Sequence, residues 1–490
     1  MMNMRTRFGV LIGLVAAATL AASASAEVKL SPMFGDHMVL QRNMRAPIWG
    51  TADPGESVTV AIGPRKVVVR ADNSGNWMAR VGPFPAGGPH TITVSSPANS
   101  ITLSNVLFGE VWIASGQSNM EWPLAAVRNA DYEVRNAANP KIRLFVVAKA
   151  VKPEPTRELV GSWAECTPET ARGFSAVAYF FGRALFRRLQ VPIGLIETAW
   201  GGTPAESWTA RKWLESDPDL SPMLARIPPP GQTVKADDPS KPAWDAWTPT
   251  GLYNAMIAPV APYGIAGAIW YQGESNASRA YQYRKLFPAM IRCWRETWGQ
   301  GDFPFIWVQL ANFMKRQPEP GESAWAELRE AQTMTLSLPK TGQAIAIDIG
   351  EADDIHPRNK QDVGIRLCLV AQHMHYGDKD VVASGPTYKS MSIKGSQVTL
   401  TFTDIGGGLM TRDGLPLAGF AVAGADRKFH WAQAKIVGST VVVSCDAVEN
   451  PVAVRYGWAD NPNCNLYNAA GLPAGPFRTD NWPGLTVNNR

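Results

Sequence analysis

The chain has 490 residues, a length that favours two or three domains and allows a substantial hydrophobic core. Hydrophobic residues make up 45% of it and charged residues 18%, proportions typical of a globular protein. A formal net charge of +5 with no block of like charge excludes a protein that binds nucleic acid by electrostatic attraction.

Residues 1–26 have the order of a secretory signal peptide. Arg5 and Arg7 precede an apolar run, and Ala24-Ser25-Ala26 follows it. The run is shorter than the roughly 20 residues that a membrane anchor needs. We therefore expect cleavage after Ala26, export to the periplasm or the medium, and no membrane association of the mature protein.

From residue 27 to about residue 105, short alternating runs are separated by turn residues. The alternation predicts strands, which bury one face each and suggest a small β-sandwich. The runs cover 57–62, 66–72, 76–81 and 90–96.

Between about residues 106 and 385, strands alternate with helical segments. This order is typical of an α/β domain with a parallel sheet covered by helices on both faces. Strands are predicted at 111–116, 191–200, 266–275, 303–311 and 343–350, and helices at 176–190, 281–299, 323–339 and 359–377. The stretch 211–250 has little periodicity and is predicted to be a loop insertion.

From residue 386 to residue 490, short strands return and predict a second β-rich domain. They cover 397–404, 418–424, 428–438, 440–445 and 453–460. Five cysteines leave at least one thiol unpaired; Cys445 and Cys464 are a possible pair that spacing does not decide.

Polar residues follow four of the α/β strands. Ser118, Gly201-Gly202, the segment 272–276 and the segment 353–356 each come after a predicted strand. Ligands of an open parallel sheet bind outside the carboxyl ends of the strands. We expect these four groups to form one site.

Ser118, in GQSNM, is either a helix cap or a nucleophile that needs a base. His356 is the histidine that follows an α/β strand with acids nearby, in EADDIHPRNK. Asp353 lies three residues before it, so one turn would bring carboxylate and imidazole together; Asp354 is the alternative, disfavoured because adjacent side chains diverge. His373 and His375 are two apart on a helix and are not expected to bind metal.

An ester hydrolase also needs donors for the oxyanion of its tetrahedral intermediate. Gly201 and Gly202 allow close backbone approach, although an isolated GlyGly is more often a plain turn. Gln272 is a candidate side-chain donor, and Glu274 a second carboxylate or a brace between loops.

The protein contains 18 tryptophans, and several lie beside the polar groups. Core packing is the default for each, but sugar rings pack on aromatic faces, so one or two are expected in a carbohydrate cleft. The four closest in sequence to the polar groups are Trp122, Trp200, Trp208 and Trp270.

The sequence resembles the sialate O-acetylesterases, whose catalytic domain is of the SGNH-hydrolase type. The resembling segments include NVLFGEVWIASGQSNMEWPL, ETAWGGTPAESW, AIWYQGESNA and IGEADDIHPRNKQDVGIRL. The resemblance implies that Ser118 is the nucleophile, His356 the base and Asp353 its orienting acid. It implies an oxyanion hole made by the Ser118 and Gly202 N–H groups. Gln272 stands where most of the superfamily has Asn.

These observations predict a secreted carbohydrate O-acetylesterase that needs no cofactor or metal. Its substrate would be an O-acetylated sugar: sialic acid or, alternatively, xylan or xyloglucan. Candidate substrate-binding residues are Gln117, Asn119, Trp122, Glu274 and Arg358. A sialate enzyme needs a cation for the substrate carboxylate, and Arg358 and Arg279 are available. The alternative from another class is a carbohydrate-binding protein without catalysis.

Overall fold

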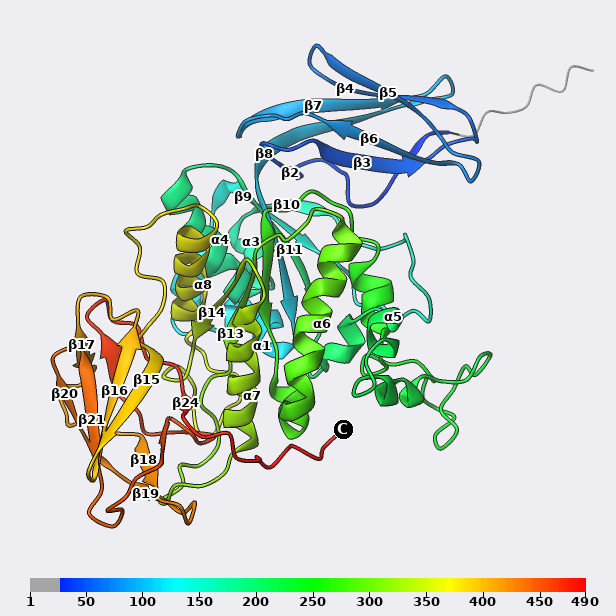
Figure 1. Cartoon of the computed structure of the whole chain (residues 1–490). Coiled ribbons are helices and arrows are strands. Elements are labelled where there is room, and N and C mark those ends of the chain that lie inside the picture. Colours follow the sequence, from blue (N-terminus) through cyan, green and yellow to red (C-terminus); the bar gives the residue numbers. More distant parts are fainter. Residues whose placement is uncertain (1–26) are drawn as a thin grey trace, which may run out of the picture.

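The computed structural model describes residues 27–490, so the predicted signal peptide lies outside the described residues. A β module, an α/β part with a central sheet and a second β module follow one another along the chain (Figure 1). The predicted fold class is confirmed. Within the described part, no helix has the length and apolar character required to cross a bilayer.

The N-terminal module consists of two sheets whose inner faces are apolar. One sheet has the order β1-β3-β6; in the other, β4 pairs with β5 and β7, and β7 and β2 pair with β8. The predicted strands at 57–62, 66–72, 76–81 and 90–96 are confirmed as β4 to β7. The strands are β1 (Lys29–Leu30), β2 (Val39–Gln41), β3 (Ala46–Thr51), β4 (Ser57–Ile62), β5 (Arg65–Arg70), β6 (Asn76–Val81), β7 (Gly87–Ser95) and β8 (Ser100–Gly116).

β8 is one continuous strand that belongs to two sheets. Its first half pairs with β7 of the N-terminal module, and its second half, from Glu110, pairs with strands of the central sheet. In the first half of β8, buried side chains are interspersed with exposed ones, whereas in the second half, inside the central sheet, every side chain is buried. The predicted domain boundary at residue 105 therefore lies inside a strand.

The central sheet has the order β10-β9-β11-β8-β12-β13-β14, and all of its pairs are parallel except β9 with β10. The predicted strand at 343–350 ends early, at Ile345, where Arg366 donates to the Ile345 carbonyl and to Asp348. Bounds are β9 (Asn139–Val146), β10 (Trp163–Cys166), β11 (Ile193–Ala199), β12 (Gly267–Tyr271), β13 (Phe305–Gln309) and β14 (Thr341–Ile345).

Helices cover both faces of this sheet (Figure 1). Trp112 of β8 packs against Phe181 of α4 on one face, and Trp270 of β12 packs against Trp294 of α6 on the other. The α-helices are α1 (Ser118–Glu121), α2 (Ala130–Arg135), α3 (Pro168–Arg172), α4 (Ala176–Leu189), α5 (Arg211–Glu215), α6 (Ala280–Trp298), α7 (Ala324–Met334) and α8 (Lys360–Met374). Short 3₁₀ helices are η1 (Leu124–Ala126), η2 (Ala205–Trp208), η3 (Ser221–Arg226), η5 (Glu274–Arg279) and η6 (Thr335–Ser337), and η4 (Tyr253–Ile257) is a π-helix.

The predicted loop insertion at 211–250 is not wholly irregular, because it begins with α5 and η3 before a long loop that projects beside α5 (Figure 1).

The C-terminal module has its own apolar core. The predicted strand at 428–438 is two strands, β19 and β20. Bounds are β15 (Thr387–Lys394), β16 (Gln397–Thr403), β17 (Leu409–Thr411), β18 (Phe420–Ala423), β19 (Phe429–Trp431), β20 (Gln433–Val437), β21 (Thr440–Ser444), β22 (Ala453–Tyr456), β23 (Leu466–Asn468) and β24 (Phe477–Arg478). Cys445 and Cys464 are both free thiols.

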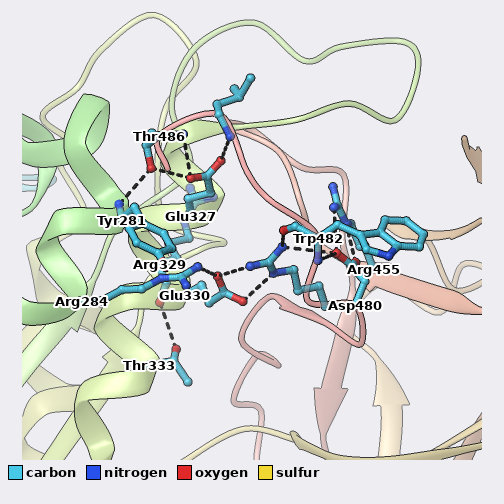
Figure 2. A network of polar contacts seen from close by, with 12 residues as sticks. Tyr281, Arg284, Glu327, Arg329, Glu330, Thr333, Arg455, Asp480, Trp482 and Thr486 are labelled. Carbon is cyan, nitrogen blue, oxygen red and sulfur yellow. Dashed lines mark hydrogen bonds and ion pairs between the residues drawn. The ribbon is translucent and has the colours of Figure 1, made fainter. Parts of the chain in front are cut away.

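The last residues of the chain run back across α7 and α6 and join the C-terminal module to the α/β part (Figure 2). Arg478 donates to Glu330 of α7 at 2.7 Å. The buried Glu327 accepts the N–H of Thr486 at 3.1 Å and its hydroxyl at 2.5 Å. These charge-assisted bonds fix the tail against the helices that follow β12 and β13.

Candidate active site

Ser118 lies directly after the central strand of the sheet. β8 ends at Gly116, where φ is +139° and a Cβ would lie 2.1 Å from the Tyr271 carbonyl oxygen, so the position requires glycine. The chain bends there and α1 begins at Ser118. Within residues 27–490, the Ser118 hydroxyl and N–H make no hydrogen bond, so both groups are available to a ligand.

The strand register brings two further loops to the same edge. Gly116 is level with Ala199 of β11 and with Tyr271 of β12. The glycines at 201–202 and the segment 272–276 therefore emerge beside Ser118. A Cβ on Gly201 would lie 3.3 Å from the Ser118 Cβ, which shows how closely that loop approaches the serine.

Gly202 adopts a left-handed conformation, with φ of +75°. Its carbonyl accepts hydrogen bonds from the Ser275 hydroxyl and the Trp247 indole, both at 2.8 Å. Its N–H has no acceptor in the described part of the chain. Gly202 and Ser118 thus offer two unpaired backbone donors in adjacent loops, the type of group that stabilises an oxyanion.

Asn119 connects the serine loop to the histidine loop. Its buried side-chain amide donates to Glu274 at 2.7 Å and to the Ile355 carbonyl at 3.0 Å, and its oxygen accepts from Lys360. Because Ile355 precedes His356, this amide holds the segment of His356 against α1. Asn119 and Glu274 thus bond to one another inside the protein, and their contact with substrate stays a prediction.

Lys360 is a buried cation behind the site that the sequence analysis missed. Burial lowers the pKa of its ammonium to about 7, and the Glu274 carboxylate opposes that change. Burial also raises the pKa of Glu274, whose Oε2 has no hydrogen-bond partner in the described residues. The sequence signal was weak, since a lysine in the first turn of an amphipathic helix is normally solvated.

His356 is half-buried and stacks on Trp122, with ring centroids 4.6 Å apart and an interplanar angle of 14°. Burial lowers its pKa; the Lys360 charge lowers it further, and Asp354 raises it. A neutral imidazole at neutral pH can accept a proton, as a general base must.

The carboxylate nearest the His356 ring is Asp354. Its Oδ1 lies 3.6 Å from His356 Nδ1 and accepts the His356 backbone N–H at 2.8 Å. Asp353 is exposed and has no hydrogen bond or ion pair with His356 in the described part of the chain. The tight turn brings Asp354, two residues before His356, back toward the ring, whereas the sequence analysis favoured Asp353.

The two glutamines at the site are inside the protein. Gln272 is fully buried; its amide donates to Asn276 at 2.7 Å and to the Thr203 carbonyl at 3.3 Å. Gln117 is also buried, and its side-chain oxygen faces the N–H groups of Gly273 and Ser275 at 3.4 Å. The role of Gln272 as an oxyanion donor stays a prediction. To donate to an oxyanion, its amide would have to give up its hydrogen bond to Asn276 or to Thr203.

The candidate cations differ in availability. Arg279 is paired with the buried Glu206 at 2.6 Å, whereas Arg358 is exposed and makes no ion pair within residues 27–490. Of the two guanidinium groups, that of Arg358 is therefore the one without a carboxylate partner in the described residues. Among residues 27–490, no group of three or more His, Cys, Asp or Glu side chains is arranged to hold a metal ion.

The four tryptophans that flank the polar groups differ in exposure to solvent. Trp208 and Trp270 are fully buried in the core. Trp122 and Trp200 are partly exposed; Trp122 supports His356, and Trp200 lies under the Lys149 ammonium at 5.3 Å. Trp247, which the sequence analysis did not select, is 52% exposed beside Gly202.

Replacing Lys360 by glutamine should move the acid limb of the pH profile. Lys360→Gln keeps an N–H donor for Asn119 but removes the charge that lowers the pKa of His356. In the parent enzyme the inflection of kcat/KM should lie below pH 6.5, since activity needs the neutral ring. In the variant it should move to higher pH.

The measurement is kcat/KM for a chromogenic acetate ester against pH. Lys212→Gln, at a surface ion pair with Glu296, is the control and should leave the inflection in place. An inflection that stays or moves to lower pH in Lys360→Gln would show that Lys360 does not act on His356.

Known proteins resemble this chain in sequence and in fold. Residues 108–372 match the family model described as carbohydrate esterase, sialic acid-specific acetylesterase. The sialate O-acetylesterase of Homo sapiens is 31% identical over 98% of this chain and 99% of its own length, and that of Mus musculus is 31% identical over 96% and 97%. The crystal structure of a carbohydrate acetylesterase from Xanthomonas citri superposes with a TM-score of 0.84, at 42% identity over 93% of this chain and all of that one. The predicted ester hydrolase is thereby confirmed, and the chain belongs to the sialic acid-specific acetylesterase family of carbohydrate esterases.

Proposed function

We propose that this enzyme hydrolyses O-acetyl esters on sialic acid by way of an acetyl-enzyme. Ser118 is the nucleophile, His356 the base and Asp354 the acid that orients it. The observation that carries the proposal is the bond from Asn119, next to Ser118, to the Ile355 carbonyl, next to His356. It keeps an unbonded serine hydroxyl and a neutral imidazole in adjoining loops.

In the first half-reaction Ser118 Oγ attacks the acetyl carbonyl carbon while His356 Nε2 takes the hydroxyl proton. The negative charge on the carbonyl oxygen is stabilised by the N–H groups of Ser118 and Gly202. The bond to the sugar oxygen then breaks, and His356 returns the proton to that oxygen. Water repeats the sequence on the acetyl-enzyme, releases acetate and restores Ser118.

The choice of sialic acid is supported by the relatives and by one cation. The curated relatives are sialate O-acetylesterases, and Arg358, two residues from His356, is exposed and unpaired within residues 27–490. A guanidinium there is suited to a sugar carboxylate. We also place the reaction outside the cytoplasm, on the basis of the predicted cleavage after Ala26.

Acetate release from three substrates tests the proposal: O-acetylated sialic acid, acetylated xylan and acetylated xyloglucan. We expect kcat/KM to be highest for the sialic acid, and Arg358→Met to lower that value more than the other two. Release from the polysaccharides alone would overturn the sialate assignment. Glycan binding without acetate release from any of the three would overturn the esterase proposal.

The orienting acid is tested by a pair of alanine variants. Asp354→Ala should lower kcat by about 10³-fold or more, the effect of removing the acid of a serine triad. Asp353→Ala, at the exposed neighbour, is the matched control and should keep most of the parent activity. A larger loss in Asp353→Ala than in Asp354→Ala would reverse the assignment.

A further inference from the structure

Trp247 is held half-exposed beside the catalytic loops. The ring is 52% exposed, an unfavourable position for so large an apolar surface. Its backbone N–H donates to Asp245 Oδ1 at 2.9 Å, and Asp245 is held in turn by Lys235 at 2.7 Å and by the Thr248 hydroxyl at 3.1 Å. The loop thus fixes this ring at the surface.

The same ring lies next to the proposed oxyanion donor. Trp247 Nε1 donates to the Gly202 carbonyl at 2.8 Å, and a Cβ on Gly202 would lie 3.6 Å from the ring. Because Gly201 in turn lies against Ser118, a sugar whose acetyl group reaches Ser118 has Trp247 at its side.

Trp247 also lines a cavity of about 380 Å³ formed by the insertion, a size within the range of small-molecule sites. Both cations at the cavity have carboxylate partners: Lys235 pairs with Asp245, and Arg226 shares the buried Glu206 with Arg279. Asp237 adds a further carboxylate to the wall. The cavity wall therefore carries two cations and two carboxylates, a balanced set that suits a neutral ligand.

We propose that Trp247 and this cavity form a subsite for a neutral sugar of the glycan, adjacent to the sugar that carries the acetyl ester. The inference rests on the proposed function at Ser118. The indole face packs on the apolar face of the neutral sugar, and the acidic sugar lies at Ser118 with its carboxylate toward Arg358. The insertion at 211–250 would then make the enzyme prefer glycans that have a neutral sugar next to the acetylated one.

The test compares substrates that differ by neutral sugars. The probes are O-acetylated N-acetylneuraminic acid and O-acetylated sialyllactose, and acetylated xylose and acetylated xylotetraose as a second pair. We expect the parent enzyme to prefer the longer member of the pair it hydrolyses, and Trp247→Ala to reduce that preference in kcat/KM by about tenfold, mainly through KM. Trp247→Phe keeps an aromatic face without the N–H and should keep most of the preference.

Trp431 provides a matched control, because it is 42% exposed and also donates its indole N–H to a backbone carbonyl, that of Pro318. Trp431→Ala should leave the preference unchanged. Equal losses on both members of a pair in Trp247→Ala would overturn the subsite and show that Trp247 only supports Gly202. If the proposed function itself is wrong, Ser118→Ala retains acetate release from every probe, whatever the Trp247 variants do.

Discussion

Replacing Ser118 by alanine is expected to lower kcat for acetate release by about 10⁴-fold or more, because the acetyl-enzyme can no longer form. The hydroxyl makes no hydrogen bond within residues 27–490, so its removal leaves no buried partner unsatisfied. The free energy of unfolding should therefore change by less than about 0.5 kcal/mol. Activity and stability respond separately at this position.

The measurement is acetate release under single-turnover and steady-state conditions, with the midpoint of thermal unfolding recorded for the same samples. Ser278→Ala, at an exposed serine of η5, is the control and should be fully active. Acetate release by Ser118→Ala at near the parent rate would remove Ser118 from the reaction. Loss of activity together with a collapse in stability would show a structural role instead.

Of the substitutions proposed for this protein, Arg329→Met is expected to lower the free energy of unfolding most. Arg329 of α7 is fully buried and donates to four backbone carbonyls, of Leu310, Ala311, Ala459 and Asp460, at 2.7–3.0 Å. The first two follow β13, and the other two belong to the C-terminal module. Methionine would leave all four acceptors without this donor, so the free energy of unfolding should fall by about 4 kcal/mol.

Calorimetry is the appropriate measurement, because the lost bonds join two parts of the chain. We expect the C-terminal module of Arg329→Met to unfold before the α/β part, in a separate transition. Arg211→Met, which breaks a surface pair with Glu215 in α5, should leave the transition unchanged. An unaltered single transition in Arg329→Met would show that the tail bonds of Figure 2 hold the two parts together without it.

Arg329 keeps its positive charge although it is fully buried. Burial lowers the pKa of its guanidinium to about 10, so the group remains charged at neutral pH and its bonds to carbonyls are charge-assisted. No carboxylate forms an ion pair with it in the described part of the chain. The bonds that Arg329 makes between the two parts therefore use backbone oxygens as acceptors, whereas the tail bonds use the carboxylates of Glu327 and Glu330.

The sequence by itself determined the fold class and the strand ends that carry chemistry. Apolar residues recur at every second position in the two β parts, and helical segments in which they recur about every 3.6 residues occur in the part between them. This change marks the β, α/β and β parts. Parallel strands place their carboxyl ends at one edge, so Ser118, Gly202 and the segment after Tyr271 could be assigned to one edge without coordinates. The predicted strand 111–116 ends at Gly116, where the structure leaves no room for a side chain.

Only the tertiary structure decided which side chains at that edge are free and which are committed. Asp354, and not Asp353, lies beside the imidazole, because a turn of the backbone sets the direction of both. Gln272 and Asn119 are bound inside the protein by partners far away in the sequence, and Lys360 is buried by the same contacts. Trp247 reaches Gly202 across 45 residues. Local patterns fix secondary structure, whereas such contacts depend on how distant loops pack.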